Sequence, residues 1–374
     1  MLRGEKRLFT PGPINTSSAV KQAMLKDLGS REDAFIQVVS EIRAGILNVA
    51  GVSREDGYEA IPIQGSGTYA MEAVLATVVG PDDRLLILVN GAYGERMVEI
   101  AECYRLKHDV YQVQENQIHE LSGVESILTS SRFTHLAVVH CETTTGILNP
   151  IEQWGTIAKI RKCKFIVDGM SSFGGVPIDF TTAQIDYLVS SSNKCLQGVP
   201  GFAFVVARRE SLLEAKHKPR SVSLNLLQQL LGFERNGQFR FTPPTHVLLA
   251  FLQALRELED EGGVEQRALR YKTNHRILCD GMRDLGFREY VPLALQSDII
   301  TAFLYPDNLN FDFQKFYRCL SEQGMLIYPG KLSKADCFRI GNIGHLYPKD
   351  VVELLMAIEK VMSEMQINLL SRRL

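Results

Sequence analysis

The chain has 374 residues, of which 45% are hydrophobic and 22% are charged, and its formal net charge is −2. This is the composition of a soluble globular protein, and the absence of a basic cluster argues against nucleic-acid binding. No uninterrupted apolar stretch is long enough to span a membrane, and residues 1–10 contain charges but no apolar signal core. The seven cysteines form no Cys-x-x-Cys pair, which predicts buried, reduced thiols, no metal site and a cytoplasmic location.

Strands and helices alternate through the first two-thirds of the chain. A helix over 32–50 is predicted to end before Gly51, a favourable residue beyond a helix C-terminus. Short apolar runs predict strands at 84–89, 136–139, 165–167 and 202–206. Helical patterns lie between them at 93–103 and 151–161. This alternation predicts an α/β domain over residues 1–262, with a mostly parallel sheet covered by helices on both faces.

The pattern changes after residue 260. Residues 259–263 form a charged break that contains glycine, and a long helix is predicted over 264–285. Shorter strands at 299–305, 324–328 and 337–340 precede a closing helix over 349–365. The sequence therefore predicts a smaller C-terminal α+β domain over residues 263–374.

Two predicted strand ends carry residues suited to bind a cofactor, since open α/β sheets bind ligands at the carboxyl ends of their strands. The segment 65–68 (Gly-Ser-Gly-Thr) precedes a helical run, whose free N–H groups favour phosphate, although such residues are also common in turns. Lys194 ends a strand among small hydroxyl residues. Partial burial there would lower its pKa and make the amine available for Schiff-base chemistry.

Asp168 closes another hydrophobic strand. A buried carboxylate requires a cationic or hydrogen-bonding partner, such as a pyridinium N–H, whereas a turn or helix-cap aspartate is the alternative. Asp168 and Lys194 are one strand–connection–strand unit apart, which predicts that they lie at neighbouring strand ends and face one cleft.

Two further strand ends carry polar or aromatic side chains. Thr143 lies in the hydroxyl-rich segment 140–146, whose hydroxyls suit a phenolic oxygen or a phosphate but also a turn. Tyr93, between two glycines in the segment 90–96, could stack on a flat ring or pack as a core tyrosine.

The order and spacing of these segments resemble the class V aminotransferases of fold type I, which use pyridoxal 5'-phosphate. The resemblance covers essentially the whole chain, and its segments are 10–13, 65–68, 90–96, 140–146, 167–169, 192–194, 241–245 and 339–341. It implies a large domain with a mostly parallel sheet flanked by helices and a smaller C-terminal α+β domain.

The resemblance also implies which residues bind the cofactor: Lys194, Asp168, Ser66, Gly67, Thr68, Tyr93, Thr143, Ser192 and Thr242. Lys194 would be the catalytic residue, which forms the Schiff base and moves the proton, and Asp168 would keep the pyridine nitrogen protonated. The segment 66–68 would hold the phosphate.

The remaining positions of the resemblance have more specific implications. Tyr93 would stack on the cofactor ring, and Thr143 would lie near its phenolic oxygen. Thr242 would reach the phosphate of a neighbouring subunit, which implies a homodimer with shared active sites. Arg339 would bind the acidic group of the substrate through a bidentate contact.

Within the class, residues 10–13, 21–29 and 198–201 are most similar to members that move the amino group of 2-aminoethylphosphonate to pyruvate by a ping-pong cycle, giving phosphonoacetaldehyde and L-alanine. An alanine–glyoxylate or serine–pyruvate aminotransferase is the nearest alternative. A lyase or desulfurase needs a mobile catalytic cysteine, and Cys337 is too close to Arg339 for that role. A nicotinamide-binding or structural protein lacks support, because no G-x-G-x-x-G follows the first strand and Asp168 and Lys194 would be unexplained.

Overall fold

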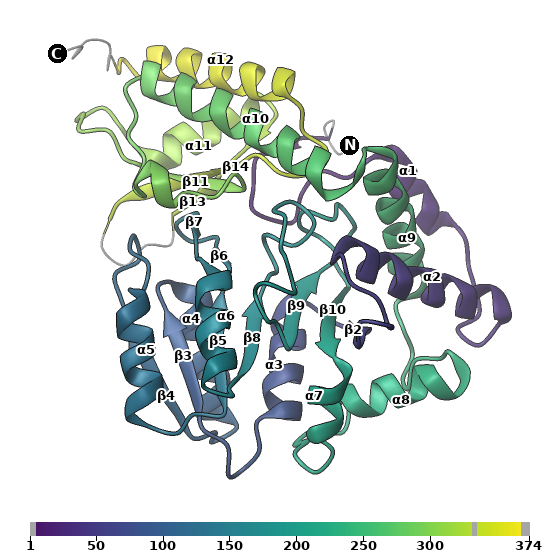
Figure 1. Cartoon of the computed structure of the whole chain (residues 1–374). Coiled ribbons are helices and arrows are strands. Elements are labelled where there is room, and N and C mark those ends of the chain that lie inside the picture. The colour runs from purple at the N-terminus through teal and green to yellow at the C-terminus, as the bar shows by residue number, and fades with distance from the viewer. Residues whose placement is uncertain (1–4, 331–334, 368–374) are drawn as a thin grey trace.

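A seven-stranded sheet forms the centre of the large domain in the computed structural model, which describes residues 5–330 and 335–367 (Figure 1). The strand order is β2-β10-β9-β8-β5-β3-β4. In chain order these strands are β2 (Tyr58–Gln64), β3 (Leu85–Val89), β4 (His108–Gln112), β5 (His135–Val139), β8 (Lys164–Asp168), β9 (Tyr187–Ser191) and β10 (Phe202–Arg208). β10 is antiparallel to both of its neighbours, and every other adjacent pair is parallel. The prediction of a mostly parallel sheet is therefore confirmed.

Helices flank this sheet and bury its central strands. All residues of β3, β5 and β9 are buried, as in parallel strands covered on both faces. The helices of this domain are α1 (Ser18–Gln22), α2 (Asp33–Val49), α3 (Gly67–Val78), α4 (Ala92–Cys103), α5 (Leu121–Ser130), α6 (Ile151–Ile160), α7 (Arg209–Glu214), α8 (Leu226–Asn236) and α9 (Thr245–Asp260). The helices predicted at 32–50, 93–103 and 151–161 are all present.

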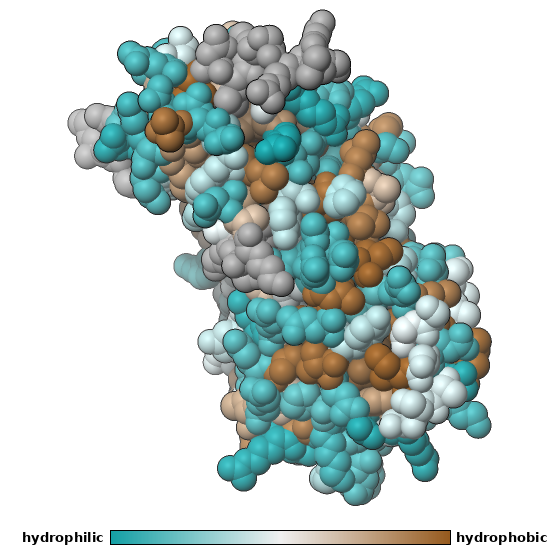
Figure 2. Space-filling view, turned by 90° about the vertical axis from the view of Figure 1, so that its left-hand side faces the viewer, coloured by the Kyte–Doolittle hydropathy of each residue, from teal (hydrophilic) through white to brown (hydrophobic). Residues whose placement is uncertain are grey.

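The edge strand β4 differs from the central strands. Its sequence is mostly polar, and none of its residues is buried. Its one aliphatic residue, Val110, is exposed. Polar and charged residues on an edge strand disfavour pairing with another chain. Figure 2 views the molecule from the side of β4 and α5, where hydrophilic residues cover most of the surface and apolar residues form separate patches.

The C-terminal part builds a second core. The long helix α10 (Gly263–Asp284) and α12 (Pro348–Glu364) pack side by side, as Figure 1 also shows, and α11 (Phe313–Glu322) packs against α12. A three-stranded antiparallel sheet has the order β11 (Ile300–Leu304), β14 (Cys337–Gly341), β13 (Tyr328–Pro329). These elements agree with the predicted smaller α+β domain.

The N-terminal segment joins this second core. β1 (Arg7–Leu8) pairs in parallel with β12 (Met325–Leu326), and Phe9 is fully buried among the apolar residues of the C-terminal part. The segment precedes the large domain in sequence but packs on the small one. The boundary between residues 262 and 263 stays a prediction.

No helix in the described parts of the chain is both long and apolar enough to cross a membrane. All seven cysteines are free. Five of them are buried, but Cys103 is exposed and Cys319 is half-buried, so the prediction of buried thiols is wrong for Cys103.

Candidate active site

Asp168 and the Lys194 turn follow neighbouring strands. Asp168 is the last residue of β8, which pairs with β9, and Lys194 lies three residues beyond the end of β9. The prediction that these residues lie at adjacent strand ends is confirmed. Their side chains interact electrostatically, since Lys194 favours the ionised form of Asp168.

The Asp168 carboxylate is buried with little compensation. Among the described residues it accepts one hydrogen bond, from the Met170 N–H to Oδ1 at 2.9 Å. Burial raises the pKa of Asp168 to about 6, opposed by this hydrogen bond and by the charges of Lys194 and Arg96. A further cationic N–H beside the carboxylate would favour its ionised form.

The Lys194 amine lies against the N-terminal segment. Its Nζ donates to the Pro11 carbonyl at 2.7 Å, and the side chain is half-buried. Gly12 has a φ of 126°, and a Cβ there would lie 2.8 Å from the Lys194 Cδ. The positive φ therefore favours glycine at this position, and a larger residue would also displace the end of the Lys194 side chain. The sequence assigned the segment 10–13 no role, and its contact with Lys194 depends on the tertiary structure.

The predicted phosphate-binding residues begin α3. Ser66 precedes this helix in extended conformation, and its hydroxyl makes no capping hydrogen bond. Arg96 Nη1 donates to Thr68 Oγ1 at 3.4 Å. A Cβ on Gly67 would collide with the Met170 sulfur, so this helix start lies beside the residue that binds Asp168. The N-terminus of α3 therefore lies at the same edge of the sheet as Asp168.

Glu142 binds the N-terminus of α4, which the sequence did not predict. Its carboxylate accepts the N–H of Gly94 at 2.8 Å and the N–H of Tyr93 at 3.1 Å, and Thr144 Oγ1 donates to it at 3.3 Å. Burial raises the pKa of Glu142 to about 7, and the two N–H groups oppose this. A Cβ on Gly91 would lie 2.7 Å from the carboxylate carbon, so Gly91 is the sequence signal for this approach. Glu142 thereby fixes the backbone that carries the half-buried Tyr93 ring.

His140 is a second buried residue that received no role from the sequence. The backbone N–H of His140 donates to the backbone carbonyl of Asp168 at 2.8 Å, and the imidazole Nδ1 lies 2.8 Å from the Ser172 hydroxyl. Burial lowers the pKa of His140 to about 4. The imidazole is therefore neutral at physiological pH and packs behind the end of β8.

Arg339 is buried without an acidic partner among the described residues. Its Nη1 donates to the Thr143 carbonyl at 2.8 Å, and its Nε and Nη2 both donate to the Pro329 carbonyl at 3.1 Å. A guanidinium has five N–H donors, so one remains on each terminal nitrogen. Burial lowers the pKa of Arg339, as expected for a cation without an ion-pair partner. A surface ion pair therefore does not account for Arg339 among the described residues.

Thr143 lies where Arg339 meets the large domain. Its Oγ1 is buried and has no hydrogen-bond partner among the described residues, which leaves the hydroxyl available to a ligand.

Two predicted residues differ from this arrangement. The single O–H of Ser192 lies within hydrogen-bond distance of the carbonyls of Val199 (2.6 Å) and Phe202 (3.1 Å), so it holds the loop that follows Lys194. Thr242 is exposed, and its carbonyl accepts a hydrogen bond from Gln64 at 3.0 Å. Its side chain makes no hydrogen bond within the described part of the chain.

Comparison with known proteins agrees with this geometry. The profile of the family described as aminotransferase class-V matches residues 16–335. A 2-aminoethylphosphonate–pyruvate transaminase from Salmonella dublin is 50% identical over 358 residues, which are 95% of this chain and 97% of the relative.

Solved structures show the same fold. Ureidoglycine–glyoxylate aminotransferase from Bacillus subtilis has a TM-score of 0.90 at 23% identity, over 98% of this chain and 95% of that one. Alanine–glyoxylate aminotransferase from Nostoc sp. has a TM-score of 0.88 at 28% identity, over 97% and 96% of the two chains. The chain has the fold type I aminotransferase architecture, and it belongs to the class-V aminotransferase family.

Proposed function

We propose that this chain transfers the amino group of 2-aminoethylphosphonate to pyruvate, giving phosphonoacetaldehyde and L-alanine. The observation that carries the proposal is Arg339, a buried guanidinium that meets carbonyls and no described carboxylate, at the side of Thr143. Such a group suits an anionic substrate, and the name of the Salmonella relative supports this amino donor and acceptor.

The residues present fit pyridoxal 5'-phosphate. The underused carboxylate of Asp168 suits a pyridinium N–H, and the unpartnered hydroxyl of Thr143 suits a phenolic oxygen. The start of α3, from Ser66 to Thr68, would hold the phosphate, and Tyr93 would cover the ring. When bound, this cofactor supplies an electron sink for the carbon that carries the amino group.

Lys194 and Asp168 then have distinct tasks. Lys194 Nζ would bind the cofactor covalently, and when the substrate amine displaces it, the same nitrogen moves the proton from the amine-bearing carbon. Asp168 would hold a proton on the pyridine nitrogen through its ionised carboxylate. The charges of Lys194 and Arg96 favour this ionised form, because they oppose the rise in pKa that burial causes.

Arg339 would orient both substrates. The two N–H groups that remain on its terminal nitrogens match a pair of oxygens of either a phosphonate or a carboxylate. The phosphorus of 2-aminoethylphosphonate lies two bonds from the amine-bearing carbon and the carboxylate carbon of alanine lies one bond from it, so one guanidinium would bind the acid groups of both half-reactions at slightly different reaches.

A half-reaction screen tests the substrate. The cofactor-loaded protein is mixed with one amine at a time, and the cofactor absorbance reports its conversion to the aminated form. We expect fast conversion by 2-aminoethylphosphonate and slower conversion by serine and glycine. Faster conversion by serine or glycine would replace the substrate assignment by that of a serine–pyruvate or a glyoxylate-linked enzyme, without affecting the cofactor assignment.

We also propose that the enzyme is a cytoplasmic homodimer in which Thr242 serves the partner's site. The exposed position of Thr242 supports this, and free cysteines are typical of a reducing compartment. In mixed dimers of a Thr242→Ala chain and a Lys194→Ala chain, one site then has both defects and the other has neither. Activity of about half the parental value per mixed dimer is the expected result, and no activity would contradict a shared site.

A further inference from the structure

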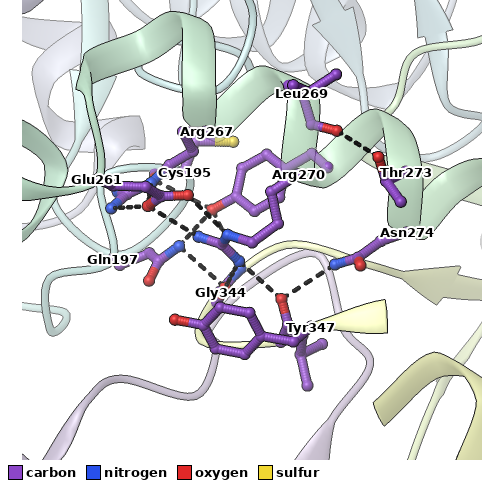
Figure 3. Close-up of polar contacts among 12 residues, drawn as sticks. Cys195, Gln197, Glu261, Arg267, Leu269, Arg270, Thr273, Asn274, Gly344 and Tyr347 are labelled. Atoms are coloured by element: carbon purple, nitrogen blue, oxygen red, sulfur yellow. Dashed lines mark hydrogen bonds and ion pairs between the residues drawn. The ribbon is translucent and has the colours of Figure 1, made fainter. Parts of the chain in front are cut away.

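The turn that carries Lys194 and the segment that follows the Arg339 strand are both hydrogen-bonded to side chains of α10. Figure 3 shows the contacts, in which side chains of Arg267, Arg270 and Asn274 on this helix reach the backbone of both segments. Neither cation of the active site takes part in these hydrogen bonds. The network therefore lies behind the site and joins its two halves.

On the large-domain side, the network holds the turn that begins at Lys194. The Gln197 N–H donates to the Lys194 carbonyl at 2.9 Å and closes the turn. The Cys195 carbonyl accepts hydrogen bonds from Arg267 Nη1 at 3.0 Å and from the Tyr271 hydroxyl at 3.3 Å. Gln197 has a φ of 60°, which is uncommon for a residue other than glycine. The contacts of the Gln197 side chain, rather than its backbone preference, therefore account for glutamine at this position.

On the small-domain side, the side chains of Gln197 and Tyr271 hold the segment that follows β14. Gln197 Nε2 donates to the Gly344 carbonyl at 2.9 Å and to the Tyr271 hydroxyl at 2.7 Å. The Gly344 N–H donates to that hydroxyl at 3.3 Å. Gly344 lies five residues beyond Arg339 on a chain that runs directly from the strand. Gln197 and Tyr271 therefore join the two segments through a single pair of side chains.

A network of charges, of which Arg267 is buried and Glu261 and Arg270 are half-buried, stiffens this arrangement. Glu261, next to the start of α10, pairs with Arg267 Nη2 at 2.8 Å and with Arg270 Nε at 2.7 Å. Arg270 Nη1 also donates to the carbonyls of Gly344 (2.9 Å) and Leu346 (2.7 Å). Loss of Glu261 would leave the buried Arg267 guanidinium without its ion-pair partner, so this network resists partial opening.

We propose that Gln197 and Tyr271 are positioning residues that set the separation between the Lys194 amine and the Arg339 guanidinium. The inference rests on the proposed function, because it assigns Lys194 to proton transfer and Arg339 to the substrate's acidic group. A substrate held at one end by Arg339 presents its reacting carbon to Lys194 only if these two groups keep their register. Misplacement by about 1 Å can cost about a hundredfold in rate.

Two substitutions interrupt the bridge from opposite sides. Tyr271→Phe removes only the hydroxyl and leaves the buried ring in place. Gln197→Gly removes the side chain and suits the backbone, because glycine adopts a φ of 60° without strain. Thr273→Ala is the matched control, since among the described residues its hydroxyl donates only to the Leu269 carbonyl of the same helix (Figure 3). Each substitution is made in the parent and in an Arg339→Ala background.

The rate of the half-reaction is measured in single turnovers at saturating amine, with 2-aminoethylphosphonate and separately with L-alanine. We expect Tyr271→Phe and Gln197→Gly to slow the parent by about 10- to 100-fold. In the Arg339→Ala background the same changes should slow it by less than about threefold, because no anchor remains to be held in register. Equal factors in both backgrounds, or no loss in the parent, would overturn the proposal.

A second readout needs no cofactor. In the cofactor-free protein, amide hydrogen exchange in residues 195–198 and 342–347 should accelerate together in both variants and stay parental in Thr273→Ala. Acceleration in only one of the two segments would also overturn the bridge. If the parent reacts with L-alanine but not with 2-aminoethylphosphonate, the proposed substrate fails, while the alanine cycle still tests the bridge.

Discussion

The two cations of the site are held in different ways. Lys194 is half-buried, and its amine has one hydrogen-bond acceptor among the described groups, the Pro11 carbonyl. Arg339 is buried and donates three hydrogen bonds to two carbonyls. A flexible lysine with one hydrogen-bond acceptor can change partners during a reaction, whereas a guanidinium held by three hydrogen bonds provides a constant reference point.

The groups that surround Lys194 and Arg339 also differ in chemical type. Beside Lys194 the large domain places the buried carboxyl of Asp168, whose pKa burial raises to about 6. Around Arg339 there are carbonyl oxygens instead. A lysine amine beside a carboxyl can exchange protons with its surroundings, whereas an arginine guanidinium stays protonated and binds an anion. We infer that the large domain performs the chemistry and the small domain selects and holds the substrate.

The largest expected effect comes from the mobile cation. Lys194→Ala should lower transamination by at least about 10⁴-fold, because the group that moves the proton is lost. The cofactor should still bind through Asp168 and the start of α3, but without the absorbance of its lysine-bound form. Lys159→Ala, an exposed lysine of α6, is the control. Full activity of Lys194→Ala would show that another group moves the proton.

Asp168→Asn tests the carboxyl beside that cation. We expect the lysine-bound absorbance to remain and the half-reaction to slow by about 10²- to 10³-fold, because an amide does not hold a proton on the pyridine nitrogen as a carboxylate does. Single-turnover rates measure this, with the exposed Asp82→Asn as the control. Parental turnover would make Asp168 a structural residue.

The positions of the catalytic candidates could be predicted from the sequence because each follows an apolar strand. A buried strand that ends in Asp168 or runs on to Lys194 is visible as a local pattern, and parallel neighbours bring such ends together. The direction of β10 and the pairing of β1 with β12 could not be predicted. They depend on contacts between segments distant in sequence, and an apolar run does not encode the direction of its strand.

The residues that the sequence missed act through the tertiary structure. Glu142 binds a helix that begins about fifty positions earlier, and Gln197 contacts Gly344 across the two domains. Their local surroundings are a hydroxyl-rich turn and an ordinary loop. Only the glycines that allow the close approaches, such as Gly91, leave a signal in the sequence.

Arg339→Ala tests the fixed cation and should have a smaller effect. Charge-assisted hydrogen bonds contribute about 1.5–3 kcal/mol each, so both half-reactions should weaken by about 10- to 100-fold. Arg339→Lys keeps the charge but not the bidentate geometry and should recover only part of the loss. A loss with 2-aminoethylphosphonate but not with L-alanine would contradict a single anchor for both substrates.

The smallest expected effect concerns the pH dependence of stability in the small domain. His275 Nδ1 lies 3.1 Å from Asp298, and Asn342, just beyond β14, donates to the Asp298 carbonyl at 2.7 Å. Burial alone would lower the pKa of His275, but hydrogen bonds with Asp298 and Cys279 outweigh it and raise the pKa to about 10. A histidine whose pKa is raised on folding stabilises the folded state fully below its ordinary pKa of 6.5. That stability is lost as the pH rises from 6.5 to about 10.

Asp298→Asn should therefore flatten the fall in unfolding free energy across this window. Because the Asp298 side chain is 40% exposed, solvent screens the pair, and we expect a change of about 1 kcal/mol or less. Urea unfolding at several pH values measures this change. The control is Asp280→Asn on α10, the helix that carries His275, since its partner Arg283 does not titrate in this range. Equal pH slopes in the two variants would remove His275 as the cause. A flatter slope for Asp298→Asn alone would indicate that alkaline pH weakens the support beneath the Arg339 strand, through a pair that makes no contact with the Lys194 turn.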